Sequence, residues 1–257
     1  IGLGIPAEPL FRSASNNMTT NETLFALLRL ALGLTQERPG SLTAAEWRKI
    51  YKSAKHQSVS GLVYTAVNHL PRENRPPFEM LVQWAGKVEA IRGMNAKQNE
   101  EATRLTRLFE AEGRKTAILK GQANARLYPD PDCRQPGDID LWMDGGRECV
   151  IDVLLKTGLI AERPDANPVD GKAWMVYHHI DLQKKANDVD VEVHFRPSQG
   201  NENPFSNRRM QQWLEQEIRL SAPMAEGFNV PSMKFALVMQ LSHGEIRAAV
   251  YPKTGVD

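Results

Sequence analysis

The sequence contains little cysteine and no long hydrophobic run. Its two cysteines, Cys133 and Cys149, are too few for a disulfide framework and have no Cys-x-x-Cys spacing, which fits a reducing compartment. No apolar run approaches the ~20 residues that a membrane span requires. The first residues also lack the basic segment and apolar core of a signal peptide. We therefore expect a cytoplasmic protein with no membrane partner.

The chain also lacks an excess of one charge. Its 32 basic and 31 acidic residues leave a net charge of +1, so its overall field gives no reason to expect strong nonspecific nucleic-acid binding. The hydrophobic fraction of 41% and the charged fraction of 25% are those of an ordinary globular protein. A chain of 257 residues can form one medium catalytic domain with helical additions or two small domains, and we favour the first.

The two ends of the chain differ in pattern from the rest. We expect residues 1–17 to be a tag or a disordered extension, because Met18 and the residues after it resemble a natural start that leads into a helix capped by Thr20 or Asn21. The apolar-periodic segment 233–250 stops without a closing element to cover its apolar face. We therefore expect the C-terminal helical region, residues 201–257, to be truncated and the chain to be a fragment of something longer.

Residues 18–113 have the periodicity of helices. An apolar stripe begins the region, and three further segments with similar spacing follow at 44–54, 59–70 and 78–112. The stripe consists of Leu24, Leu27, Leu28, Ala31 and Leu32. Gly93 interrupts the last segment only weakly, since a single glycine costs ~1 kcal/mol in a helix.

The pattern changes after Gly113. Residues 115–121 and 138–143 have the length and composition of strands, with a short helix at 122–128 and a helix at 147–157. Prolines 129, 131 and 136 make the segment between helix and second strand a loop. We therefore predict an α+β fold, in which a small mixed or antiparallel sheet at residues 114–200 is flanked by N-terminal and C-terminal helices.

A β-hairpin is predicted from residues 175–184 and 189–195, with a turn near 186–188. A two-residue turn centred on 186–187 places Asp181 opposite Glu192 and His179 opposite His194. Polar and apolar side chains then separate onto two faces. The polar face consists of His179, Asp181, Gln183, Asp190, Glu192 and His194; the apolar face consists of Ile180, Leu182, Val189, Val191, Val193 and Phe195.

The pair Asp138 and Asp140 is a candidate metal site. Their spacing puts both carboxylates on one face of a strand, ~6.6 Å apart along it, and hard divalent cations prefer carboxylate oxygens. Such a pair alone is more often a solvated strand face. Two neighbours strengthen the metal interpretation: the turn at Lys120-Gly121 precedes a helix whose N–H groups could hold phosphate, and the hairpin carboxylates would repel one another without a cation or a basic partner.

Several of these pieces occur together in one known family. The run Ile118-Leu-Lys-Gly121, then Leu127-Tyr-Pro129, Arg134, Gly137-Asp-Ile-Asp-Leu141, His178-His179 and Val191-Glu-Val-His194, resembles uncharacterised bacterial nucleotidyltransferases of the polymerase-beta-like superfamily, whose acceptors are unknown. The similarity is close over residues 116–196 and loose in the flanking helices.

The resemblance implies a function for each matching residue. Asp138 and Asp140 would hold Mg²⁺ or Mn²⁺, and Glu192 would be the third carboxylate. The phosphates of a nucleoside triphosphate (NTP) substrate would lie at Lys120, Gly121 and Gln122, with Arg134 neutralising an oxygen. The sequence departs from the family at Gly121-Gln122, where a Gly-Ser or Gly-Gly pair is usual, so Lys120 is expected to take over part of the phosphate contact.

Other residues have weaker claims. His178 and His179 are more readily explained as packed or surface histidines than as metal ligands. His194 shares a face with Glu192 and either orients it or makes a structural hydrogen bond. His243 falls in an apolar helical stripe, and the five tryptophans are too scattered for a base-stacking platform.

Three functions are compatible with these residues. The first is a metal-dependent enzyme that transfers a nucleotidyl group from an NTP to an acceptor hydroxyl on a small molecule, an RNA end or a protein side chain. The alternative is a catalytically silent nucleotide-binding or regulatory module of the same fold, which Gln122 leaves open. The third is a metal phosphohydrolase, and it ranks last because we expect the chain to lack the His/Asp-rich ligand set of such sites.

Overall fold

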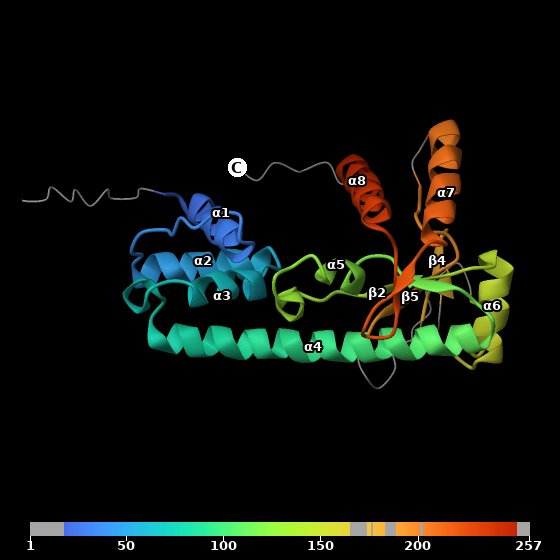
Figure 1. The fold of residues 1–257 in the computed structure, drawn as a ribbon, viewed down its shortest axis with the longest axis horizontal. Helices are drawn as coiled ribbons and strands as arrows, with labels where there is room; N and C mark the ends of the chain where they lie inside the picture. Colours follow the sequence, from blue (N-terminus) through green and yellow to red (C-terminus); the bar gives the residue numbers. More distant parts are fainter. Residues whose placement is uncertain (1–17, 165–173, 176, 183–188, 201–202, 251–257) are drawn as a thin grey trace, which may run out of the picture. The chain divides into compact units, whose positions relative to one another are not determined.

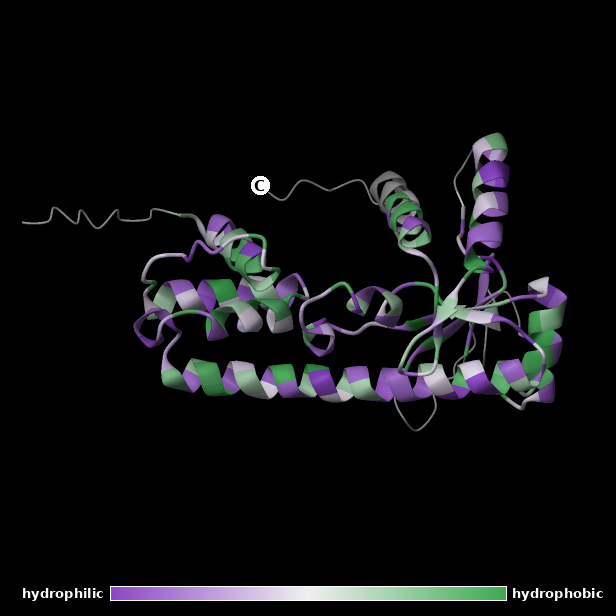
Figure 2. Ribbon diagram, viewed as in Figure 1, coloured by the Kyte–Doolittle hydropathy of each residue, from purple (hydrophilic) through white to green (hydrophobic). Residues whose placement is uncertain are grey.

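The structure is a computed structural model that describes residues 18–164, 174–175, 177–182, 189–200 and 203–250, with the side chains of 174 and 243–250 excluded. The chain forms two compact units, one reaching Val88 and the other beginning at Glu89. The boundary falls within a long helix, α4 (Phe78–Ala111), which contributes residues to both units (Figure 1). Hydrophilic and hydrophobic residues alternate along this helix (Figure 2), and Gly93 does not interrupt it.

The first unit is helical, as the periodicity predicts. It contains α1 (Thr20–Ala31), α2 (Ala44–His56), α3 (Ser60–Asn68), the short 3-10 helix η1 (Arg72–Asn74) and the first part of α4. The predicted cap at Thr20 or Asn21 is wrong by one or two positions. Thr19 caps α1, because its hydroxyl accepts from the Glu22 N–H at 3.3 Å while its own N–H donates to the Glu22 carboxylate at 2.7 Å.

Aromatic side chains form the core of this first unit. Trp84 is fully buried, its indole N–H donates to the Ser60 carbonyl at 2.9 Å, and the Trp47, Tyr51 and Tyr64 rings surround it. A buried indole N–H usually finds such a hydrogen-bond acceptor. These two tryptophans are therefore packing residues, as expected.

The second unit is built on a five-stranded mixed sheet with the order β1-β2-β5-β4-β3. The strands are β1 (Thr116–Ile118), β2 (Ile139–Met143), β3 (Trp174–Met175), β4 (His179–Asp181) and β5 (Val191–His194). β2 and β5 are parallel, and the other neighbours are antiparallel. The predicted α+β fold with a small mixed sheet is confirmed.

The remaining elements surround this sheet. They are α5 (Gln122–Ala125), the 3-10 helix η2 (Pro131–Cys133), α6 (Gly146–Lys156), α7 (Pro204–Ile218), the strand pair β6 (Ala222–Pro223) and β7 (Asn229–Val230), and α8 (Met233–Val250). α5 is shorter than predicted. The N–H groups of Leu127 and Tyr128 bond three residues back rather than four, so the helix ends in a tighter turn before Pro129.

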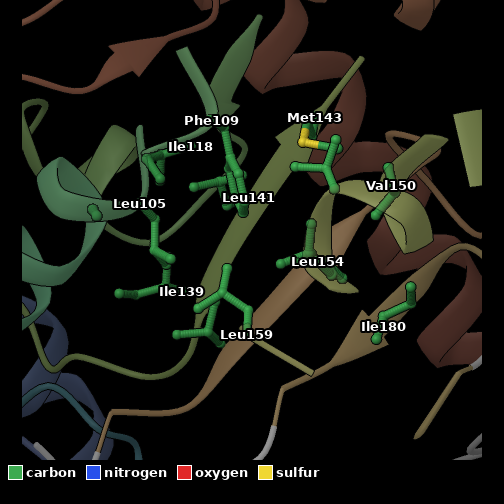
Figure 3. Close-up of a cluster of buried hydrophobic side chains, with 14 of the residues drawn as sticks. Leu105, Phe109, Ile118, Ile139, Leu141, Met143, Val150, Leu154, Leu159 and Ile180 are labelled. Carbon is green, nitrogen blue, oxygen red and sulfur yellow. The ribbon is translucent and has the colours of Figure 1, made fainter. Parts of the chain in front are cut away.

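Each face of the sheet has its own hydrophobic cluster. One face packs against α4 and α6 (Figure 3), and its labelled members include Leu105, Phe109, Ile118, Ile139, Leu141, Met143, Val150, Leu154, Leu159 and Ile180. On the other face, Ala117, Leu119 and Trp142 pack with residues of α7 and α8. Because side chains alternate along a strand, Asp140 projects to the same side as Trp142. The candidate site thus lies on the α7/α8 side of the sheet.

The predicted hairpin register is confirmed. His179 pairs with His194 and Asp181 with Glu192, and the predicted apolar face joins the α4/α6 cluster. The turn itself and Gln183 lie outside the described residues, as do residues 1–17, the side chain of His243 and residues 251–257. None of the helices in the described part of the chain is long and apolar enough to cross a membrane.

Candidate functional site

Strand pairing builds a row of three carboxylates across the sheet. Asp140 of β2 lies opposite Glu192 of β5, and Glu192 lies opposite Asp181 of β4. Adjacent strands are ~4.8 Å apart, and like charges placed directly opposite destabilise a sheet. The row therefore requires positive charge from the protein or from a bound cation.

Asp140 is the most buried member of the row. Its side chain is 1% exposed, since β2 is an interior strand covered on this side by α7 and α8. Its Oδ1 accepts from Lys120 Nζ at 2.9 Å and lies 3.2 Å from His194 Nε2. Its Oδ2 is buried and has no hydrogen-bond partner among the residues that the structure describes. A buried carboxylate oxygen without a partner is costly, and it marks a position that a cation can fill.

Lys120 reaches Asp140 because β1 and β2 continue their alignment beyond the last paired residues. The Leu119 N–H donates to the Asp140 carbonyl at 2.9 Å, which places Lys120 beside the Asp140 side chain. Burial would lower the pKa of Lys120, but the neighbouring Asp140 charge and its hydrogen bond raise it. Lys120 therefore stays charged.

His194 links two of the three carboxylates. Its Nε2 lies 3.2 Å from both Asp140 Oδ1 and Glu192 Oε2. Burial would lower the pKa of His194, but these two hydrogen bonds raise it to about 9. Burial likewise opposes ionisation of Asp140, while His194 and Lys120 lower its pKa to about 2. Without a metal, an imidazolium and an ammonium thus offset part of the negative charge of the site.

Asp138 lies at the rim of the same group. It is half-buried, and burial together with repulsion from Asp140 raises its pKa, an effect that Lys120 partly offsets. The charge of Glu192 also raises the pKa of Asp138. All three predicted metal carboxylates therefore interact electrostatically, although Asp140 and Glu192 are the two that strand pairing brings side by side.

A second row on the same face consists of histidines. His179 Nδ1 lies 3.2 Å from His178 Nε2, and His179 Nε2 lies 3.1 Å from Asp181 Oδ2. The rings of His178 and His179 are 5.2 and 4.9 Å from the His194 ring. Burial and the charges of the other two histidines lower the pKa of His178 to about 3. His178 is therefore neutral and able to accept a hydrogen bond or a metal.

Three triplets within the described residues have ligand atoms within 4.8 Å of one another. They are His178–His179–His194, Asp140–Glu192–His194 and His179–Asp181–Glu192. The expectation that the chain lacks a His/Asp-rich ligand set is therefore wrong. That expectation was the reason for ranking a phosphohydrolase last. The signal was present in the hairpin register, which already put His179, His194 and Glu192 on one face.

The turn before α5 has a conformation reserved for glycine. Gly121 has φ +57° and ψ −110°, and a Cβ at this position would lie 3.5 Å from the Asp138 carbonyl oxygen. The backbone thus needs glycine here irrespective of any ligand. The neighbouring Gln122 side chain points to α4, where it donates to Asn99 Oδ1 at 2.7 Å. Only the backbone of Gln122 is left to contact a phosphate.

The loop between α5 and β2 is anchored by buried polar residues of α4, which the sequence did not reveal. Asn95 donates to the carbonyls of Asp132 and Arg134 at 2.7 and 2.8 Å, and Gln98 donates to the Gly137 carbonyl. Asn95 and Gln98 are each 1% exposed. They hold the chain on both sides of Arg134 and directly before Asp138.

Arg134 has spare hydrogen-bonding capacity. Its Nη1 is buried without a hydrogen-bond partner, and its guanidinium forms no ion pair with any residue the structure describes. A guanidinium with an unused donor is suited to bind a phosphate or carboxylate oxygen.

The chain matches the model of a known protein family. Residues 43–256 match the model of a family described as uncharacterised nucleotidyltransferase. Searches of curated proteins and of solved structures gave no significant match.

Proposed function

The family match covers most of the chain, which therefore belongs to the uncharacterised nucleotidyltransferases, and we propose that it transfers a nucleotidyl group from an NTP to an acceptor hydroxyl. The acceptor oxygen would attack the α-phosphorus, the bond to pyrophosphate would break, and the hydroxyl proton would pass to a base of the carboxylate cluster. The acceptor would be a small molecule, an RNA end or a protein side chain.

The observation that carries this proposal is the environment of Asp140. Its buried Oδ2 has no hydrogen-bond partner among the described residues, and Glu192 lies opposite it across the β2–β5 pair. This arrangement fits a divalent cation, which prefers carboxylate oxygens. We propose Asp138, Asp140 and Glu192 as the ligands of Mg²⁺ or Mn²⁺. Such cations, when bound, neutralise charge on the attacking and leaving oxygens.

Basic groups next to the carboxylates would position the nucleotide. We propose that Arg134 binds an outer phosphate oxygen through its unused Nη1, and that Lys120 contributes positive charge from the turn before α5. The Gly121 turn would bring backbone N–H groups close to the phosphates without a Cβ in the way. Asn95 would act as a positioning residue, because it bonds the Arg134 carbonyl.

A second candidate function follows from the Lys120–Asp140 ion pair. With Lys120 at 2.9 Å and a protonated His194 at 3.2 Å, the protein supplies its own cations to Asp140. A catalytically silent nucleotide-binding module would keep this arrangement and need no metal. Metal dependence of nucleotide binding separates the two functions.

The test is a calorimetric titration with nonhydrolysable analogues of each of the four ribonucleoside triphosphates, carried out with and without Mg²⁺. We expect Mg²⁺-dependent binding that Arg134→Ala weakens at least tenfold, or about 1.4 kcal/mol. Arg147→Ala is the matched control, since Arg147 is exposed on α6 and stacks on the Phe195 ring at 5.3 Å. Equal affinity of both variants and the parent would place the phosphates elsewhere.

Product analysis with an α-labelled NTP completes the test. Label transferred to an added acceptor fraction supports nucleotidyl transfer. Label recovered only as free nucleoside monophosphate would mean that water is the acceptor, and unchanged NTP despite Mg²⁺-dependent binding would favour the silent module.

A further inference from the structure

The histidine row has a feature that the carboxylate site does not require. Two ring nitrogens, His178 Nε2 and His179 Nδ1, face each other at 3.2 Å. Two nitrogen ligands bound tetrahedrally to one ion at 2.0–2.1 Å are about 3.3 Å apart. The observed spacing is thus close to that of two ligands on a single metal ion.

In His179 and His194 one ring nitrogen is held by a carboxylate, whereas His178 Nδ1 is buried without a hydrogen-bond partner among the described residues. His179 Nε2 lies 3.1 Å from Asp181 Oδ2, and His194 Nε2 lies 3.2 Å from Asp140 and Glu192. Histidines that bind metals usually donate their second ring N–H to a carboxylate in this way, which fixes the tautomer and the ring orientation. In His194 the remaining nitrogen, Nδ1, is buried and finds no hydrogen-bond partner in the described part of the chain.

The third ring is close enough to complete a ligand set. One ring nitrogen from each of His178, His179 and His194 lies within 4.8 Å of the other two, and His194 is 3% exposed. Ligands of one ion at 2.0–2.1 Å can be at most about 4.2 Å apart, so small side-chain shifts suffice. Imidazole nitrogen favours Zn²⁺ and similar transition metals over Mg²⁺.

We propose that His178, His179 and His194 form a binding position for a nitrogen-preferring divalent transition-metal ion, such as Zn²⁺ or Co²⁺, beside the carboxylate row. The inference goes beyond the proposed nucleotidyl transfer, since it concerns a second ion. That ion would be bound by nitrogen atoms and is separate from the Mg²⁺ proposed at Asp138, Asp140 and Glu192. The shared neighbours Asp140 and Glu192 couple the two positions, because both receive hydrogen bonds from His194.

The experiment is a Co²⁺ titration of the chelator-treated full chain, monitored by the visible absorption of the bound ion. We expect one equivalent to produce the intense band of nitrogen-ligated tetrahedral Co²⁺. His178→Gln and His179→Gln should each weaken binding at least tenfold, the scale seen when metal-site groups are removed. His69→Gln is the matched control, because His69 is exposed at the end of α3 in the other unit and should not change the titration.

A second readout uses the parent alone and does not depend on how the variants fold. Of the six histidines in the chain, three ring signals in the NMR spectrum should shift on addition of one equivalent of Zn²⁺. Absence of both the Co²⁺ band and the ring shifts would overturn the inference and leave a hydrogen-bonded histidine cluster. Parent-like Co²⁺ affinity in both variants would also overturn it, because the ion would then be held by carboxylates.

The result is separable from that for nucleotide transfer. Co²⁺ binding that depends on His178 in a protein that binds no NTP would support the histidine position and remove the proposed function. Mg²⁺-dependent NTP binding, together with Co²⁺ binding that the histidine substitutions do not change, would support the proposed function and overturn the histidine position.

Discussion

Replacing Asp140 by Asn tests the metal assignment most directly, because the change keeps the shape and removes one ligand charge. A cation at 100 times its dissociation constant stabilises the folded protein by about 2.7 kcal/mol. Each kcal/mol shifts the melting temperature of a unit of this size by about 2–4 °C. We therefore expect Mg²⁺ or Mn²⁺, added with a nonhydrolysable NTP, to raise the melting temperature of the parent by about 5–10 °C and that of Asp140→Asn very little.

The metal-free variant has its own expected stability. Asp140 neutralises Lys120 and His194, and removing one partner of a buried pair costs about 3–5 kcal/mol. The cost is smaller here because Lys120 is 27% exposed and because repulsion between Asp140 and Glu192 is relieved. We expect a loss of about 1–3 kcal/mol, so each variant is compared with and without metal.

The assay is a thermal melt with and without metal, and Asp144→Asn is the matched control. Asp144 follows β2 and accepts from the Lys115 N–H at 2.9 Å, outside the carboxylate row. Its variant should lose some stability but keep the full metal-dependent shift. A metal shift in Asp140→Asn as large as that of the parent would refute the assignment of Asp140 as a ligand.

Two predictions concern the scaffold of the site and are read out by urea unfolding. Gly121→Ala should destabilise the chain by about 1–3 kcal/mol because of its positive φ. Gly93→Ala should stabilise it by about 0.5–1 kcal/mol, because an added Cβ there meets no described atom within 4 Å beyond its chain neighbours and the backbone of α4 itself. Similar effects of the two changes would contradict the backbone argument. Leu141→Ala should cost about 2–5 kcal/mol because Leu141 is 0% exposed, while Leu127→Ala, at a side chain 49% exposed, should change stability by less than about 0.5 kcal/mol. A small effect at Leu141 would mean that the cluster on the α4/α6 face collapses around the cavity.

The sequence by itself determined the features that depend on local periodicity. Alternation along residues 179–195 predicts which side chains share a polar face and which share an apolar face. A turn centred on residues 186–187 then predicts the pairs Asp181–Glu192 and His179–His194, which the structure contains. A one-residue slip would have moved every apolar side chain to the wrong face. The helices followed from their apolar stripes for the same reason, since burial of one face selects the 3.6-residue period.

Only the tertiary structure decided which of these elements meet. Nothing in the local pattern specifies that β2 pairs in parallel with β5, yet this pairing alone places Asp140 beside Glu192. The buried ion pair of Lys120 with Asp140, and the anchoring of the Arg134 loop by Asn95, join residues on different elements. Such contacts form because a buried charge or amide must find a partner wherever the fold offers one, and periodicity within one element carries no information about that partner.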